Sequence, residues 1–222
     1  MLDSKAFRTI SYGLYLIASC ADDKTSGCVV NTFSQVTSDP FQVSVALNKE
    51  NHTCSTICRA GKYTATVLAE GATMELIGRF GYKSSRDLDK FELSATKNDD
   101  FGLPYVLEST VARFSVCVTD SIDLGTHIMF IGKVSEAEML SDEAPMTYSY
   151  YHVVKGGKTP PRASSYIPDE DDEEILAAKT TEGTKAWRCT VCGHIEYADE
   201  LPADYVCPIC GAGPELFELI EE

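Results

Sequence analysis

Hydrophobic and polar positions in the first 160 residues follow a pattern that predicts mainly β-structure. Val43, Val45 and Leu47 alternate with small or polar residues, as on a strand that buries one face. Runs of apolar and β-branched residues predict further strands at 63–68, 111–118 and 127–134. Because few helices interrupt these strands, we expect a β-barrel rather than a doubly wound sheet.

Two short helices are predicted between the strands. Residues 52–60 are followed by Gly61, and residues 73–80 are followed by Gly81. Glycine commonly ends a helix because it adopts a positive φ without steric cost. The chain contains no Gly-x-Gly-x-x-Gly sequence, so a Rossmann nucleotide site is not expected.

The C-terminal region contains two Cys-x-x-Cys pairs, each followed by a glycine. The cysteines are Cys189, Cys192, Cys207 and Cys210. Two residues between thiolates let one tight turn present both sulfurs to one metal, and two such turns complete a tetrahedron. Spacing alone leaves two alternatives, a structural zinc ribbon and a one-iron site, and slightly favours zinc.

The residues around these cysteines resemble those of rubredoxin, a one-iron electron carrier. The resemblance covers 187–193, 200–212 and Phe217, with a tyrosine at 205 where the family usually has tryptophan. Only fourteen residues separate Cys192 from Cys207, as in short rubredoxins that are fused to other redox domains. The resemblance implies iron in place of zinc. We expect the metal to supply much of the folding free energy, with Trp187, Tyr197, Tyr205 and Phe217 packed beneath it.

Charge divides the chain unevenly. Residues 161–222 contain 4 basic and 15 acidic side chains, a net charge of −11 out of −15 for the whole protein. Nucleic acids and anionic membranes are therefore not expected as partners. The acidic run 169–174, preceded by two prolines and two serines, predicts an interdomain linker. We expect domains at 1–158 and 185–222, joined by a linker at 159–184.

Cysteine usage and hydropathy indicate the cellular compartment in which the protein is expected. Five cysteines remain outside the metal site, an odd number, and we expect them to be reduced and mostly buried. Cys54 and Cys58 lie four residues apart on a predicted helix, and their proximity is interpreted as accidental rather than redox-active. No apolar stretch approaches the ~18 residues of a membrane span, and no leader sequence is recognisable. We expect a soluble, cytoplasmic protein.

Polar side chains cluster at both ends of the strand around residue 45, in segments 31–40 and 48–53. Turn chemistry alone would explain such clusters. Their order, however, resembles the flavin reductase-like, FMN-binding split-barrel family over residues 5–155. The segment 80–91 also matches a family pattern, with Ser85 in place of a glycine, and His127 matches a histidine that lies near the flavin or nicotinamide.

The resemblance implies an FMN site and names His127 as the one candidate for a catalytic role. The residues expected to bind the cofactor are Asn31, Thr32, Phe33, Ser34, Gln35, Val36, Thr37, Asn48, Lys49, Asn51, His52, Thr53, Ser84, Ser85 and Arg86. The family is usually homodimeric, with flavin sites near the subunit interface, so a homodimer is expected.

The order of the domains is similar to that of the high-molecular-weight rubredoxins of anaerobic bacteria. This similarity implies that NAD(P)H reduces FMN, that FMN reduces one iron, and that the iron passes electrons to a flavodiiron protein that reduces nitric oxide or dioxygen. Two alternatives stay open. One is a free-flavin or ferric reductase with a zinc-bearing docking module, and the other is a redox carrier that needs a separate reductase.

Overall fold

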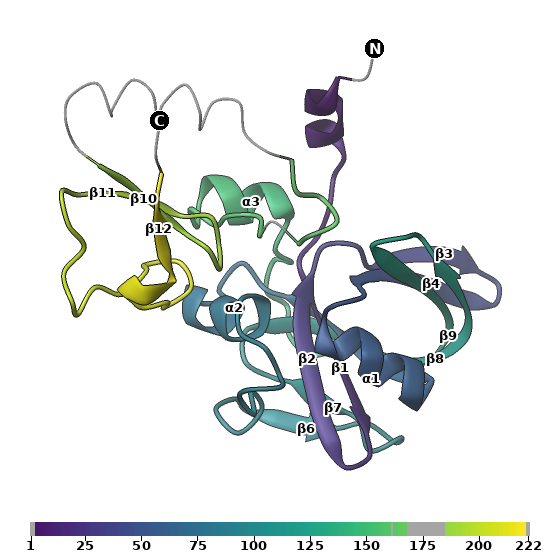
Figure 1. The fold of residues 1–222 in the computed structure, drawn as a ribbon. Coiled ribbons are helices and arrows are strands. Elements are labelled where there is room, and N and C mark those ends of the chain that lie inside the picture. The colour runs from purple at the N-terminus through teal and green to yellow at the C-terminus, as the bar shows by residue number, and fades with distance from the viewer. Residues whose placement is uncertain (1–2, 161, 168–184, 221–222) are drawn as a thin grey trace.

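The computed structural model describes residues 3–160, 162–167 and 185–220. The largest element of this chain is a strongly curved antiparallel sheet (Figure 1). Its seven strands are β1 (Tyr15–Ala21), β2 (Lys24–Val30), β3 (Ser34–Ser38), β4 (Phe41–Asn48), β5 (Lys62–Leu68), β8 (Thr110–Asp123) and β9 (His127–Met139). They are hydrogen-bonded in the order β2-β1-β5-β8-β9-β4-β3, so β2 and β3 lie at the two edges. The expectation of a mainly β fold is confirmed.

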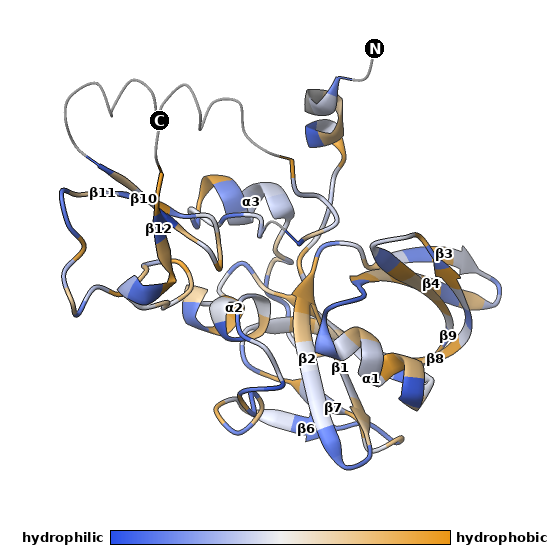
Figure 2. Cartoon of the chain, viewed as in Figure 1, coloured by the Kyte–Doolittle hydropathy of each residue, from blue (hydrophilic) through white to orange (hydrophobic). Residues whose placement is uncertain are grey.

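Side-chain alternation explains how this sheet encloses a core. On β4, Val43, Val45 and Leu47 are buried, while the residues between them are more exposed, as the sequence predicts. Irregularities in register between Ser115 and Val116 and between Val118 and Asp120 interrupt the long β8–β9 ladder. Such bulges increase local twist and help a sheet to curve. Figure 2 shows β2 changing from polar at its start to apolar at its end.

The two predicted helices are present. In α1 (His52–Ala60), the Asn51 side chain accepts a hydrogen bond from Thr53 N, and Gly61 ends the helix at φ 64° as predicted. In α2 (Met74–Gly81), Thr73 caps the first turn. The second helix ends at Gly81 as predicted, but Gly81 is its last helical residue, and the cap is Tyr82 in a right-handed conformation.

The larger part of the chain contains two hydrophobic clusters, one on each side of β1. Leu16 belongs to the cluster beneath α2 and α3 (Tyr148–Val153), whereas Ile17 belongs to the cluster inside the barrel. A short hairpin, β6 (Thr96–Asn98) and β7 (Pro104–Val106), and the 3₁₀ helix η1 (Ser4–Thr9) complete this part. Among the described residues, no helix is both long and apolar enough to cross a membrane.

The C-terminal part is a small three-stranded sheet beside α2 (Figure 1). It consists of β10 (Ala186–Cys189), β11 (Ile195–Tyr197) and β12 (Phe217–Leu219), with the 3₁₀ helix η2 (Pro214–Leu216) before β12. Its core contains the four cysteines, and Trp187, Tyr205 and Phe217 pack with them. Tyr197, the fourth aromatic residue predicted for this core, is half-buried on β11.

Candidate functional site

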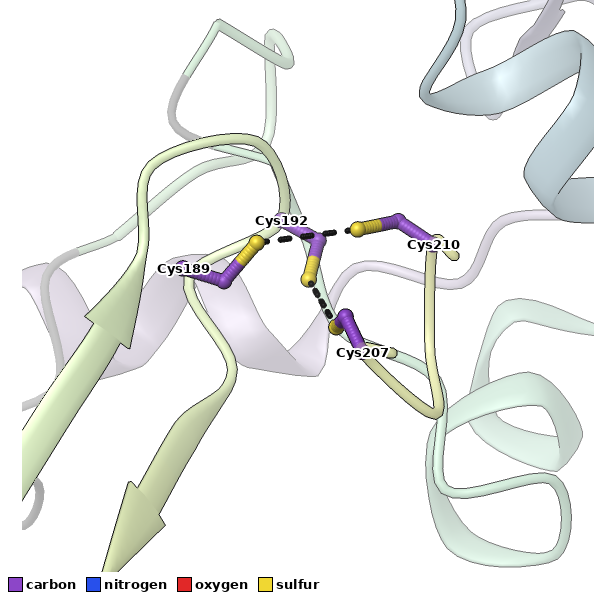
Figure 3. A group of neighbouring side chains, drawn as sticks. All are labelled: Cys189, Cys192, Cys207 and Cys210. Carbon is purple, nitrogen blue, oxygen red and sulfur yellow. Dashed lines mark hydrogen bonds between the residues drawn. The ribbon is translucent and has the colours of Figure 1, made fainter. Parts of the chain in front are cut away.

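The four C-terminal cysteines converge on one point (Figure 3). All are buried, and their sulfur atoms lie within 4.8 Å of one another. The sulfurs of Cys189 and Cys210 are 3.6 Å apart, as are those of Cys192 and Cys207, so each knuckle faces the other. A buried set of sulfur ligands from two turns fits a single tetrahedral iron or zinc ion.

Backbone N–H groups of the first knuckle are directed at the Cys189 sulfur. Gly193 and Gly211, each after the second cysteine of its pair, adopt φ values of 77° and 73°, which glycine tolerates without steric cost. Burial raises the pKa of the Cys189 thiol, although the backbone N–H groups of Cys192 and Val191 donate to its sulfur and act in the opposite direction. The hydrogen bond between Cys192 and Cys210 lowers the pKa of Cys210 and raises that of Cys192. The backbone donors would stabilise thiolate charge when a metal ion displaces the protons.

The other five cysteines are free thiols. Only Cys28 and Cys54 are buried, whereas Cys58 is exposed and the remaining two are intermediate. The expectation that most of them are buried is therefore wrong. Burial raises the pKa of Cys54 to about 12, so this thiol is protonated at neutral pH.

A pocket of about 590 Å³ lies beside β2, α1 and α2. Its walls come from the ends of β2 and β4, the starts of α1 and β9, the loop after α2, and α3. This volume is in the ordinary range for cofactor pockets. The lining contains five cationic side chains, Lys83, Arg86, Lys90, Lys158 and Arg162, against the acidic Glu50 and Asp87.

This positive charge is unusual in a protein with a net charge of −15. Its effect is visible at His52, the first residue of α1, where burial and then the charge of Arg86 lower the pKa of the imidazole. Helix N-termini present unpaired N–H groups and attract anions. Arg86 reaches the same place, since its guanidinium donates to Glu50 O at 3.4 Å. The start of α1 together with Arg86 is suited to a phosphate group.

Nine of the predicted site residues line this pocket, including His127. The others are Asn31, Thr32, Asn48, Asn51, His52, Ser84, Ser85 and Arg86. Segments far apart in sequence meet here because β4 pairs with β9, which places Asn48 opposite His127. Burial lowers the pKa of His127, so its ring is neutral at pH 7. The hydroxyl of Ser85 is hydrogen-bonded to the backbone of Gly27, which fastens the loop to β2.

Seven predicted residues do not line the pocket of this chain. Phe33 is buried in the barrel, with its ring centroid 5.2 Å from that of Tyr15. Lys49 forms an ion pair with Asp123 at 2.6 Å, and Thr53 is buried at the start of α1. The remaining four lie on the edge strand β3: Ser34, Gln35, Val36 and Thr37. They were predicted in one run with Asn31 and Thr32, but only those first two residues line the pocket, because the chain then continues along the edge strand β3.

Several pocket residues were missed by the sequence interpretation. Lys90 is 2% exposed, and its ammonium group donates to Gly27 O at 2.8 Å and to Phe80 O at 3.2 Å. Burial lowers its pKa to about 8. Tyr82 and Tyr151 also line the pocket. Lys90 lies within the segment that matches the family pattern, so the sequence could have indicated it as a pocket residue. The two tyrosines are far apart in sequence and meet only through tertiary packing.

The beginning of the predicted linker also reaches the pocket. Asn31 Nδ2 donates to Ser165 Oγ at 2.7 Å, and Asn48 Nδ2 donates to Arg162 O at 3.1 Å. Arg162 forms an exposed ion pair with Glu50 at 2.8 Å. Residues 162–165 thus lie along the predicted flavin site, while the acidic run 169–174 is outside the described residues. The domain boundaries stay a prediction.

Comparison with known proteins identifies the two parts of the chain. Residues 7–157 match the flavin reductase like domain family, and residues 187–218 match the rubrerythrin, rubredoxin-like domain family. The chain therefore belongs to the flavin reductase-like family and has a C-terminal rubredoxin-like domain. The predicted resemblance is confirmed for both parts.

Two curated relatives are similar over long stretches. The high molecular weight rubredoxin of Moorella thermoacetica is 39% identical over 99% of this chain and 100% of its own length. The ferric-chelate reductase (NAD(P)H) of Archaeoglobus fulgidus is 40% identical over 75% of this chain and 98% of its own length. These relatives and the two matching families identify an oxidoreductase that combines a flavin reductase domain with a rubredoxin-like domain.

Solved structures share the fold at low identity. Nitrilotriacetate monooxygenase component B from Mycobacterium thermoresistibile has a TM-score of 0.58 at 23% identity, over 65% of this chain and 79% of that one. The NADH:FAD oxidoreductase SgcE6 of Streptomyces globisporus has a TM-score of 0.59 at 18% identity, over 65% and 86%. These structures support the barrel architecture.

Proposed function

We propose that this protein oxidises NAD(P)H through FMN and passes single electrons to one iron ion held by the four cysteines. The observation that carries the proposal is that Thr190 and Val191, from the first cysteine knuckle, line the same pocket as Arg86, Asn48 and His127. A cationic cofactor pocket and a four-thiol metal centre thus share a wall. Bound FMN would accept a hydride and release its electrons one at a time, and an iron–thiolate centre would accept one electron.

The pocket residues have distinct proposed roles. Arg86 and the N-terminus of α1 hold the FMN phosphate, because both present positive charge at one end of the pocket. Asn31 and Asn48 offer amide groups to the polar edge of the flavin ring. His127, neutral and next to Asn48, contacts the nicotinamide side without exchanging a proton, since hydride transfer requires no acid or base there.

We also propose a homodimer that uses the β3–β4 edge. Val36 and Phe41 are 52% and 62% exposed on these strands, and β3 has no neighbour on its outer side among the described strands. Exposed apolar side chains on an unpaired edge strand favour association. In a dimer, β3 would bring Ser34 to Thr37 toward the partner subunit. Sedimentation analysis tests this, with Phe41→Lys expected to yield monomer.

The outside electron acceptor in this proposal is a flavodiiron protein that reduces nitric oxide or dioxygen. Support comes from the whole-length similarity to a high molecular weight rubredoxin and from the acidic C-terminal region, which suits a partner with a basic surface. Electron transfer to such a partner should slow as salt concentration rises.

An anaerobic visible spectrum tests the core of the proposal. The purified protein is mixed with NADH, and in parallel with NADPH, and the flavin and ferric–thiolate bands are followed separately. Bleaching of both bands supports the relay and identifies the nucleotide. In Cys210→Ser the flavin band should still bleach, because Cys210 does not line the pocket, while the ferric–thiolate band should be lost.

Other outcomes would contradict the proposal in distinguishable ways. Flavin bleaching in a protein that contains zinc and no iron would indicate a flavin or ferric reductase with a docking module. Iron and flavin bands that neither nucleotide bleaches would indicate a carrier that needs a separate reductase.

A further inference from the structure

Helix α2 approaches the second cysteine knuckle without a side chain between them. A Cβ atom added to Gly78 would lie 3.4 Å from the backbone oxygen of Ile209 and 4.0 Å from the Cα of Cys210. Gly78 is buried in the middle of α2. A single added carbon at Gly78 would therefore reach van der Waals contact with the turn that presents Cys210.

Tyr82 extends this contact toward the pocket. It follows Gly78 by four residues, so both lie on the same side of the helix. The Tyr82 ring packs against the cysteine cluster and also lines the flavin pocket. On the other side of the contact, Val191 of the first knuckle packs against the cysteines and lines the same pocket.

We propose that the surface of α2 formed by Gly78 and Tyr82, here called the α2 docking surface, is the site where the rubredoxin-like domain of the same chain receives electrons. This inference rests on the proposed function. In each transfer one electron leaves the reduced flavin and Fe(III) becomes Fe(II), so the two electrons of one hydride leave in two transfers. Tyr82 and Gly78 are positioning residues, because they set the approach of the knuckles to the pocket.

The docked arrangement restricts the size of the side chain at position 78. A methyl group would be tolerated at the distances above, but a longer side chain would extend into the knuckle backbone. The contact therefore limits the size of residue 78 and does not require glycine itself.

Docking of the rubredoxin-like domain on α2 also restricts its delivery of electrons to other proteins. Val191 and Ile209 are half-buried in the docked arrangement, and the Ile209 backbone oxygen faces Gly78 of α2. One knuckle face cannot contact α2 and an outside acceptor at once. The rubredoxin-like domain must leave the α2 docking surface before a protein acceptor can bind this face.

Rapid mixing with NAD(P)H tests the docking surface directly. Gly78→Gln introduces a neutral side chain with good helix propensity, and Gly78→Ala is its matched control. Gly78 does not line the pocket, so flavin bleaching should stay within twofold of wild type in both variants. Iron bleaching should slow at least tenfold in Gly78→Gln and remain near wild type in Gly78→Ala. An unchanged iron rate in Gly78→Gln would overturn the proposal.

Hydrogen exchange supplies a readout that does not depend on electron transfer. In zinc-loaded protein, peptides covering 74–82 and 207–212 should exchange faster in Gly78→Gln than in Gly78→Ala. Equal exchange would refute docking at this surface. Should Gly78→Gln fail to fold, Ile209→Gln changes the knuckle residue whose backbone oxygen faces Gly78, and its ferric–thiolate band reports whether the domain is intact.

The two readouts separate this inference from the proposed function. If iron in the wild-type protein never bleaches while the exchange difference is present, the docking surface stands and the relay is wrong. If wild-type iron bleaches but neither Gly78→Gln nor Ile209→Gln changes rate or exchange, the relay stands and the docking surface is wrong.

Discussion

The phenol oxygens of Tyr82 and Tyr151 lie 2.6 Å apart, and both hydroxyl groups reach the backbone oxygen of Lys158. This arrangement joins the end of α2 to α3 and to the chain that leaves the barrel. Burial raises the pKa of both phenols, that of Tyr151 to about 12, so both are neutral at physiological pH. The pair therefore holds together the segments that form the wall between pocket and metal centre.

Removing one hydroxyl should weaken this junction measurably. Tyr82→Phe keeps the ring and leaves Tyr151 bonded to Lys158, so we expect a loss of about 1 kcal/mol in the stability of the flavin domain. Because the two hydroxyls share partners, the double variant with Tyr151→Phe should lose less than the sum of the single losses. Denaturant unfolding followed by flavin absorbance measures both quantities. Strictly additive losses would show that the hydroxyls act independently.

Arg86 should determine affinity for the FMN phosphate. Replacement by Gln removes a charged hydrogen bond that is expected to contribute about 1.5–3 kcal/mol, so the Kd for FMN should rise about tenfold to a hundredfold. Riboflavin lacks the phosphate, and its affinity should not change. Fluorescence titration with both ligands measures this, with Lys97→Gln, an exposed residue on β6, as control. Equal losses for FMN and riboflavin would place the phosphate elsewhere.

Metal removal should unfold the C-terminal part alone. Its core is six buried residues, four of them the cysteines, so the metal is expected to contribute most of the folding free energy. Trp187 is the single tryptophan of the chain, and its indole N–H donates to Ala198 O at 2.9 Å, so its fluorescence reports on this part. Cys210→Ser should shift the emission to longer wavelength without changing bound flavin, whereas Cys58→Ser should change neither. An unshifted emission in Cys210→Ser would mean that the fold does not depend on metal.

Lys90 should make the stability of the cofactor-free protein depend on pH. Its folded pKa of about 8 lies below the ordinary value of 10.5, so the unfolded chain binds more protons between these values. The stability contributed by Lys90 should therefore rise with pH through this window and fall as pH drops toward 8. Urea unfolding at several pH values, comparing wild type with Lys90→Met, measures this difference. A constant difference across the window would contradict the lowered pKa, and exposed Lys97→Met serves as the reference.

The sequence predicted those features that depend on local pattern. Alternation identified β4, and the glycine after residue 60 identified the end of α1. The two Cys-x-x-Cys pairs identified the metal cluster, because spacing within a turn is fixed by covalent geometry. Gly81 likewise located the end of α2, although it is the last helical residue and Tyr82 is the cap.

Features that depend on tertiary packing could not be predicted. Residues 34–37 were grouped with Asn31 and Thr32 by their order in the sequence, but they lie on the edge strand β3 and do not line the pocket of this chain. The pairing of Tyr82 with Tyr151 and the approach of Gly78 to Ile209 join segments more than 60 residues apart. No local pattern encodes contacts of this kind, and they define the wall between pocket and metal centre.

The most direct test of the relay is an anaerobic titration of the wild-type protein with the nucleotide that it prefers. FMN takes up two electrons and iron takes up one, so both bands should be fully bleached at about 1.5 equivalents of NAD(P)H per chain. Bleaching that stops at about one equivalent, with the ferric–thiolate band intact, would contradict the account, because the iron would then not receive electrons from the flavin.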